Sequence, residues 1–129
     1  MSKVSKPYDI RERTFEFARD VLKSYPGTVR SHTPSAEVWR QLIRSGTSVG
    51  ANLEEAHASG SKADFRFRVK VALREARESH YWLRLIDAAN LVGEDRVDQL
   101  RTEADEIIAI LTTIAKNSAN SPKTHQNRA

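Results

Sequence analysis

The sequence predicts an all-α protein, an antiparallel up-down-up-down four-helix bundle. Apolar residues recur at helical spacing in four segments, and short polar or glycine-containing links separate these segments. No segment alternates in the way a β-strand does. With 129 residues and no Cys, the chain fits one domain that can bury a core without disulfides.

The first two helices have clear start signals. We expect the first at about residues 9–25, with Asp9 as its N-cap, after a disordered segment 1–8. We expect the second at about residues 34–59, because Thr33-Pro34 fits an N-cap followed by proline in the first turn. Its middle contains Gly46-x-x-x-Gly50, and glycine costs about 1 kcal/mol per residue against alanine in a helix. The small residues therefore predict that a neighbouring backbone approaches closely.

A tight turn should join the second helix to a long third helix at about residues 61–91. Gly60 fits the end of the second helix, and Ser61 with Asp64 resembles a capping box. Gly93 fits the end of the third. The expected core positions of the third helix are Phe65, Val69, Ala72, Ala76, Ser79, Leu83 and Ile86. A second apolar set faces either another helix of the bundle or another subunit: Phe67, Val71, Trp82, Leu85 and Ala89.

The fourth helix is expected at about residues 94–117, with an acidic first turn that complements the helix dipole. The polar segment 118–129 contains Pro122 and is predicted to be disordered. Domain organisation is thus one bundle, residues 9–117, between two disordered ends.

The net charge of +4 is unevenly distributed. Residues 1–30 and residues 61–93 each carry a net charge of +3, whereas residues 94–116 carry −3. Cations at i, i+4 or i+3 spacing follow the third helix and are candidates for contacts to nucleic-acid phosphates: Lys62, Arg66, Lys70, Arg74 and Arg77. Arg11, Arg19 and Lys23 would add to them if the first helix lies alongside. The alternatives are a plain solvated face, or neutralisation by the acidic fourth helix.

A polar group is expected inside the bundle at Asn52, which lies beside the apolar positions of the second helix. A buried amide must be hydrogen-bonded and can fix the register between helices. Glu55 and Glu78 are its candidate companions, and the alternative is an exposed Asn. Ser79 on the core side of the third helix is expected to bond a backbone carbonyl.

The sequence offers no catalytic apparatus. A bundle di-metal site needs two Glu-x-x-His motifs, and the chain has one, Glu54-x-x-His57, away from the apolar positions. Ser79 and His80 are adjacent on a helix and diverge, and no glycine-rich phosphate loop exists. We therefore expect no enzyme activity, no metal, no cofactor and no small-molecule substrate. No long apolar run or signal-peptide pattern occurs, so we expect no membrane contact and a cytoplasmic location.

Two stretches in the middle of the chain resemble a known family. They are Asn52-Leu53-x-Glu55 and the run from Glu75 to Leu83, EARESHYWL, in which Glu75-Ala76-x-Glu78-Ser79 and Tyr81-Trp82-Leu83 match. The chain is similar over about residues 10–116 to the four-helix-bundle family named after the 23S ribosomal RNA intervening-sequence proteins. It departs from the family at Ala56, where glycine is usual, which favours Gly60 as the end of the second helix.

The resemblance implies an up-down bundle that self-associates, and related proteins form pentameric rings. It also implies kinship with the accessory proteins of diversity-generating retroelements, basic bundles that act with a reverse transcriptase and nucleic acid. Our hypothesis is a non-enzymatic homo-oligomer that binds RNA or DNA through basic helix faces. The alternative is a structural or adaptor oligomer without a nucleic-acid ligand. Subunit number is left open.

Overall fold

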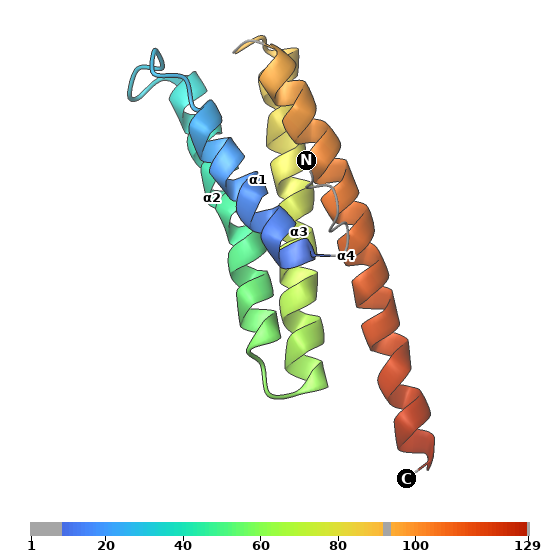
Figure 1. The fold of residues 1–129 in the computed structure, drawn as a ribbon. Coiled ribbons are helices and arrows are strands. Elements are labelled where there is room, and N and C mark those ends of the chain that lie inside the picture. Colours follow the sequence, from blue (N-terminus) through green and yellow to red (C-terminus); the bar gives the residue numbers. More distant parts are fainter. Residues whose placement is uncertain (1–8, 92–93, 129) are drawn as a thin grey trace.

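The structure, a computed structural model, describes residues 9–91 and 94–128, with side chains for 9–91 and 97–118. These residues form four helices: α1 (Ile10–Ser24), α2 (Pro34–His57), α3 (Lys62–Ala88) and α4 (Glu94–Arg128). Consecutive helices run in opposite directions (Figure 1). The predicted all-α, up-down-up-down bundle is confirmed.

The helices pack as a ring of neighbours. α1 packs closely against α2 and α4, and α3 also packs closely against α2 and α4, whereas the backbones of the diagonal pairs α1/α3 and α2/α4 do not approach each other closely among the described residues. Each helix therefore buries two adjoining flanks and leaves the opposite side to solvent. No helix in the described part of the chain is long and apolar enough to cross a membrane.

The predicted helix starts are confirmed. The side chains of Asp9, Thr33 and Ser61 accept hydrogen bonds from the backbone N–H groups three residues on. Such bonds satisfy donors that have no partner within the helix. The turn from α2 to α3 is short, as expected, and keeps these two helices antiparallel and adjacent.

The ends of α2 and α3 differ from the prediction. Gly60 does not terminate α2, because the helix ends at His57 with Ala58 as its C-cap. α3 ends at Ala88, and Asn90 adopts a left-handed conformation with φ 60°. The N–H of Asn90 donates to the carbonyl of Asp87, and the N–H of Leu91 donates to the carbonyl of Ile86. These two hydrogen bonds define a Schellman motif. Asn tolerates this conformation better than most residues.

Three further predictions concern the end of α3 and the two ends of the chain. Gly93, expected as the end of α3, and the segment 1–8 lie outside the described residues. α4 continues to Arg128, whereas we expected it to end at residue 117 and the segment 118–129 to be disordered. The packed part of α4 provides a nucleus, and each further helical residue then adds one backbone hydrogen bond.

The predicted core of α3 is largely confirmed. Val69, Ala72, Ala76, Leu83 and Ile86 are buried together with apolar side chains of the other three helices, and Phe65 is half-buried against them. The second apolar set lies toward the outside. Phe67 and Ala89 are exposed, and Val71, Trp82 and Leu85 are half-buried.

The two glycines of α2 lie against α1. A Cβ atom on Gly46 would be 3.3 Å from a methyl carbon of Val21, and one on Gly50 would be 3.2 Å from the Thr14 hydroxyl and 3.4 Å from the Thr14 carbonyl carbon. The predicted close backbone approach is confirmed, and the neighbour is α1.

Candidate nucleic-acid interface

The five predicted cations of α3 remain together on its outer side, and we call them the basic face: Lys62, Arg66, Lys70, Arg74 and Arg77. Arg66 is half-buried, and the other four are exposed. None of them forms an ion pair with a described residue. Their spacing along the helix gives about one cation per 5.4 Å turn.

Three acidic residues of α4 engage other partners. Glu103 and Glu106 both accept from the Arg13 guanidinium at 2.7 Å, and these hydrogen bonds raise the pKa of Arg13. Asp105 lies 3.1 Å from Nε2 of His80. Among the described side chains, these α4 carboxylates therefore contact Arg13 of α1 and His80 of α3, and none of them pairs with the basic face.

The three cations of α1 cannot extend the basic face, because α1 lies diagonally across the bundle from α3. Arg11 makes two bonds to the Glu54 carboxylate of α2, at 2.8 and 3.3 Å. Arg19 pairs with Asp20 at 3.0 Å, and Lys23 also has a partner. Arg11, Arg19 and Lys23 were expected to add to the basic face only if the first helix lies alongside the third, and this condition is not met.

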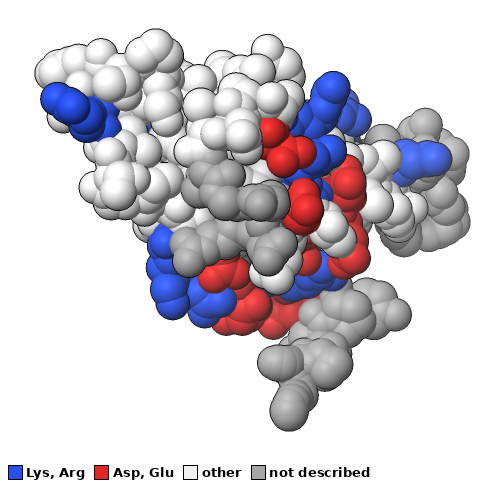
Figure 2. All heavy atoms as spheres, turned by 90° about the horizontal axis from the view of Figure 1, so that it is seen from above, with Lys and Arg blue, Asp and Glu red and all other residues white. Residues whose placement is uncertain are grey.

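Acidic and basic side chains adjoin one another elsewhere on the molecule. Figure 2 looks down on the end that carries the α1–α2 and α3–α4 links, and red spheres lie directly against blue ones there. One ion pair between helices joins Arg101 of α4 to Asp87 in the last turn of α3 at 2.9 Å. The basic face differs from these regions in forming no ion pair among the described residues; its Arg74 interacts with Glu78 only at longer range.

Asn52 is half-buried, and both polar groups of its amide are hydrogen-bonded, but not to the companions we expected. Its amide donates to the Ser48 carbonyl at 2.9 Å, and its oxygen accepts from Arg68 at 3.2 Å. Glu55 is exposed and bonds to none of the described residues. Its assignment to a polar core is wrong, because its side chain lies in solvent. Asn52 and Arg68 therefore form one of the polar links between α2 and α3.

Glu78 belongs to a second polar cluster on the same side of the bundle. It accepts from Arg44 of α2 and from the indole N–H of Trp82 at 2.9 Å, and Arg44 also reaches Glu75 at 3.2 Å. The hydrogen bond from Arg44 is the main reason that the pKa of Glu78 is lowered, with the Trp82 N–H acting in the same direction against partial burial. This cluster ties the middle of α2 to α3.

Glu78 should make stability depend on pH in the acid range. A carboxyl whose pKa is lowered by folding contributes stability above its unfolded pKa, and this contribution is lost as pH falls through the folded value. Glu78→Gln should therefore be less stable than the wild type at pH 7, and the difference should shrink between about pH 5 and pH 3. Thermal unfolding followed by circular dichroism measures it. Glu55→Gln is the control, because Glu55 has no described partner; an equal and constant effect of both changes would contradict the assignment.

Ser79 is fully buried and bonds the Glu75 carbonyl at 2.9 Å, as predicted. It also lies 2.9 Å from the hydroxyl of Ser45, which is buried on α2. This serine pair lets α2 and α3 pack closely without leaving either hydroxyl unsatisfied.

No metal-binding group of three or more suitable side chains gathers among the residues with described side chains. Glu54 of the Glu54-x-x-His57 motif is bonded to Arg11, and His57 is exposed. The described side chains thus form structural polar clusters and one unpaired basic face.

Comparisons with known proteins bear on this arrangement. The family model described as "23S rRNA-intervening sequence protein" matches residues 6–113. A crystal structure of a protein with unknown function from the S23 ribosomal protein family of Bacteroides thetaiotaomicron is 29% identical to the chain, with a TM-score of 0.73. The match covers 83% of this chain and 98% of that one. No curated protein matches.

Proposed function

Since the chain belongs to the 23S rRNA-intervening sequence protein family, we propose that it is a non-enzymatic, homo-oligomeric bundle of the cytoplasm that binds RNA. The ligand lies along the basic face, and Lys62, Arg66, Lys70, Arg74 and Arg77 contact its phosphates. One observation carries the proposal: none of these cations forms an ion pair with a described carboxylate, and Arg74 interacts with Glu78 only at longer range, whereas several arginines of α1, α2 and α4 are paired.

Physical chemistry supports a phosphate backbone as the ligand. Lys and Arg side chains that neutralise phosphates release condensed counterions, and this release supplies most of the sequence-independent affinity. A cation that already holds a carboxylate must give up that partner first, and the basic face has no such requirement within the described residues. No base-reading module accompanies the face, so binding should be sensitive to salt and weakly specific for sequence.

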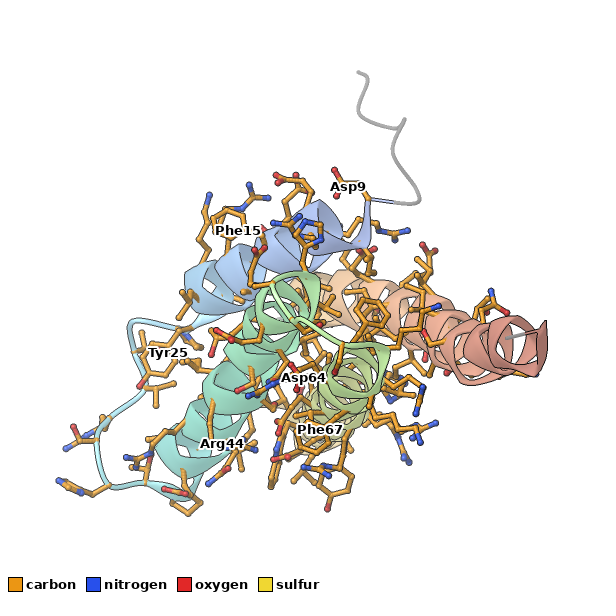
Figure 3. The ribbon with its side chains drawn as sticks, turned by 90° about the horizontal axis from the view of Figure 1, so that it is seen from below. Asp9, Phe15, Tyr25, Arg44, Asp64 and Phe67 are labelled. Carbon is orange, nitrogen blue, oxygen red and sulfur yellow. The ribbon has the colours of Figure 1, made fainter. Side chains whose placement is uncertain are left out.

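Self-association is supported by a separate apolar surface on α1. Phe15 is 65% exposed and Leu22 is 52% exposed. They are seven residues apart and thus share one face of the helix, and clustered exposed apolar side chains are typical of contact surfaces. A second copy of the chain is the proposed occupant. In Figure 3, Phe15 points away from the bundle on the side opposite Phe67 of α3, so this contact leaves the basic face open.

The proposal is tested by reversing charges on the basic face. The full chain carrying Arg66→Glu, Lys70→Glu and Arg74→Glu should bind RNA roughly a hundredfold more weakly at 0.1 M salt, with a shallower salt dependence, because about three phosphate contacts are lost. Fluorescence anisotropy with a labelled RNA measures the affinity at several salt concentrations.

A matched control changes the net charge equally at other exposed positions. Arg30→Glu, Arg40→Glu and Lys116→Glu together should bind nearly as the wild type does, apart from long-range electrostatics that salt screens. The proposal is wrong if the Arg66/Lys70/Arg74 variant keeps its helicity and particle mass and still binds RNA as tightly as the wild type.

A structural or adaptor oligomer is the alternative function, and one observation favours it. α4 is rich in acids, and Asp98 is exposed without a described partner, so a basic α3 could pair with an acidic α4 of another copy. This alternative requires that high salt dissociates the oligomer and that the purified protein carries no nucleic acid. Size-exclusion chromatography with light scattering and the ratio of absorbance at 260 and 280 nm decides between the two.

A further inference from the structure

Two exposed aromatic rings bracket the middle of the basic face. Phe67 is 57% exposed and Tyr81 is 52% exposed. They are fourteen residues apart on α3, which is about four turns and about 21 Å along the helix axis. Lys70, Arg74 and Arg77 lie between them on the same outer side. The helix therefore presents a row that begins and ends with a ring and holds cations in between.

Each ring is supported on one side and open on the other. The guanidinium carbon of Arg68 lies 5.7 Å from the centre of the Phe67 ring. Tyr81 packs edge-to-face with Trp82, with ring centres 5.0 Å apart and planes at 73°. Trp82 is itself held by its bond to Glu78. These contacts restrict the orientation of both rings while about half of each remains accessible.

We infer that the ligand of the basic face is unpaired, single-stranded RNA, whose bases stack on Phe67 and Tyr81 while Lys70, Arg74 and Arg77 neutralise the phosphates between them. This inference rests on the proposed function and names the class of nucleic acid. Proteins that bind single strands without reading their sequence use two elements: cations along the backbone and aromatic rings on which the bases stack.

A duplex does not use the rings. In double-stranded RNA the faces of the bases are covered by their neighbours, and proteins contact phosphates and 2′-hydroxyl groups instead. A single strand offers free base faces and a backbone with a rise of about 3.4 Å per stacked nucleotide, so about six nucleotides span the distance between the rings. Phe67 and Tyr81 therefore favour the single strand over the duplex, whereas the cations serve both.

The test removes the rings and leaves every charge in place. The full chain with Phe67→Ala and Tyr81→Ala is compared with the wild type for a labelled 12-nucleotide oligouridylate and for a 12-base-pair RNA duplex of mixed sequence. The single-strand affinity should fall roughly tenfold or more per ring, while the salt slope and the duplex affinity stay unchanged. The variant with Phe67→Tyr and Tyr81→Phe keeps both rings and should retain single-strand binding.

The failures are distinguishable. If the double-alanine variant binds oligouridylate as tightly as the wild type, stacking is wrong and the charge-based proposal stands. If its particle mass by light scattering falls and both RNAs are bound more weakly, the rings contact another copy of the chain, which also overturns the inference. If the wild type binds neither RNA, both the proposed function and this inference are wrong.

Discussion

Trp39→Ala should lower the free energy of unfolding by about 3–5 kcal/mol, the range for deleting a large buried aromatic side chain. Trp39 is fully buried in α2 and packs edge-to-face against Tyr25, with ring centres 5.8 Å apart and planes at 87°. The ring thus joins the C-terminal end of α1 to α2. A loss of this size is a large part of the 5–15 kcal/mol that stabilises a typical domain.

Trp39→Phe separates packing from polarity. The indole N–H of Trp39 is buried without a hydrogen-bond partner among the described residues, and an unsatisfied buried donor costs free energy. Phenylalanine removes this donor and keeps most of the ring, so it should cost less than about 1.5 kcal/mol. Urea denaturation of both variants measures the difference. If the alanine variant were no less stable than the phenylalanine variant, the buried ring of Trp39 would not contribute the packing energy expected here.

Gly50→Leu should destabilise the bundle by about 3 kcal/mol or more, because there is no space for a side chain where α2 meets α1. The first added carbon would already lie 3.2 Å from the Thr14 hydroxyl and 3.4 Å from its carbonyl carbon. That hydroxyl is fixed by a 2.8 Å bond to the Ile10 carbonyl, so it cannot move aside cheaply. Overpacking a tight core position typically costs 1–3 kcal/mol, and here backbone must move as well.

Ala51→Leu is the matched control for Gly50→Leu. Ala51 is exposed on the adjacent position of α2, and leucine is nearly as good a helix former as alanine. This change should alter stability by less than about 0.5 kcal/mol. Thermal unfolding by circular dichroism compares the two, and equal stabilities would mean that α1 does not pack against Gly50.

The sequence predicts the architecture well because each helix has local signals that agree with its packing. Asp9, Thr33 and Ser61 start helices as expected, and the periodic apolar positions of α3 from Val69 to Ile86 are buried. The ends were harder to predict. Gly60 resembles a terminator, yet α2 stops at His57, and Asn90 supplies the left-handed residue after α3. Several residue types can end a helix, and the local sequence does not say which one is used.

The polar contacts between helices could be predicted less completely. A helix's periodicity shows which residues share a face, but not how far its neighbour is rotated about its own axis. Asn52 was expected to be buried inside the bundle and is half-buried, and its partner Arg68 depends on that rotation. Arg13 lies on the polar side of α1. The packing of α4 against α1 brings Glu103 and Glu106 to it, and the sequence does not show that packing. The sequence marks the basic face of α3; its lack of carboxylate partners follows from where α4 directs its acids.

The diagonal placement of α1 and α3 has a consequence for avidity. If copies associate through Phe15 and Leu22 of α1, every copy in the assembly turns its basic face outward. A long RNA strand held by one copy is then presented to the next at a high effective concentration, and linked binding events of this kind can exceed a single site's affinity by a factor of 10²–10⁴ without any new contact. Short oligonucleotides that span one face gain nothing from the assembly. The apparent affinity for RNA should therefore rise steeply with RNA length, and the separation of basic faces between adjacent copies sets the length at which the rise begins.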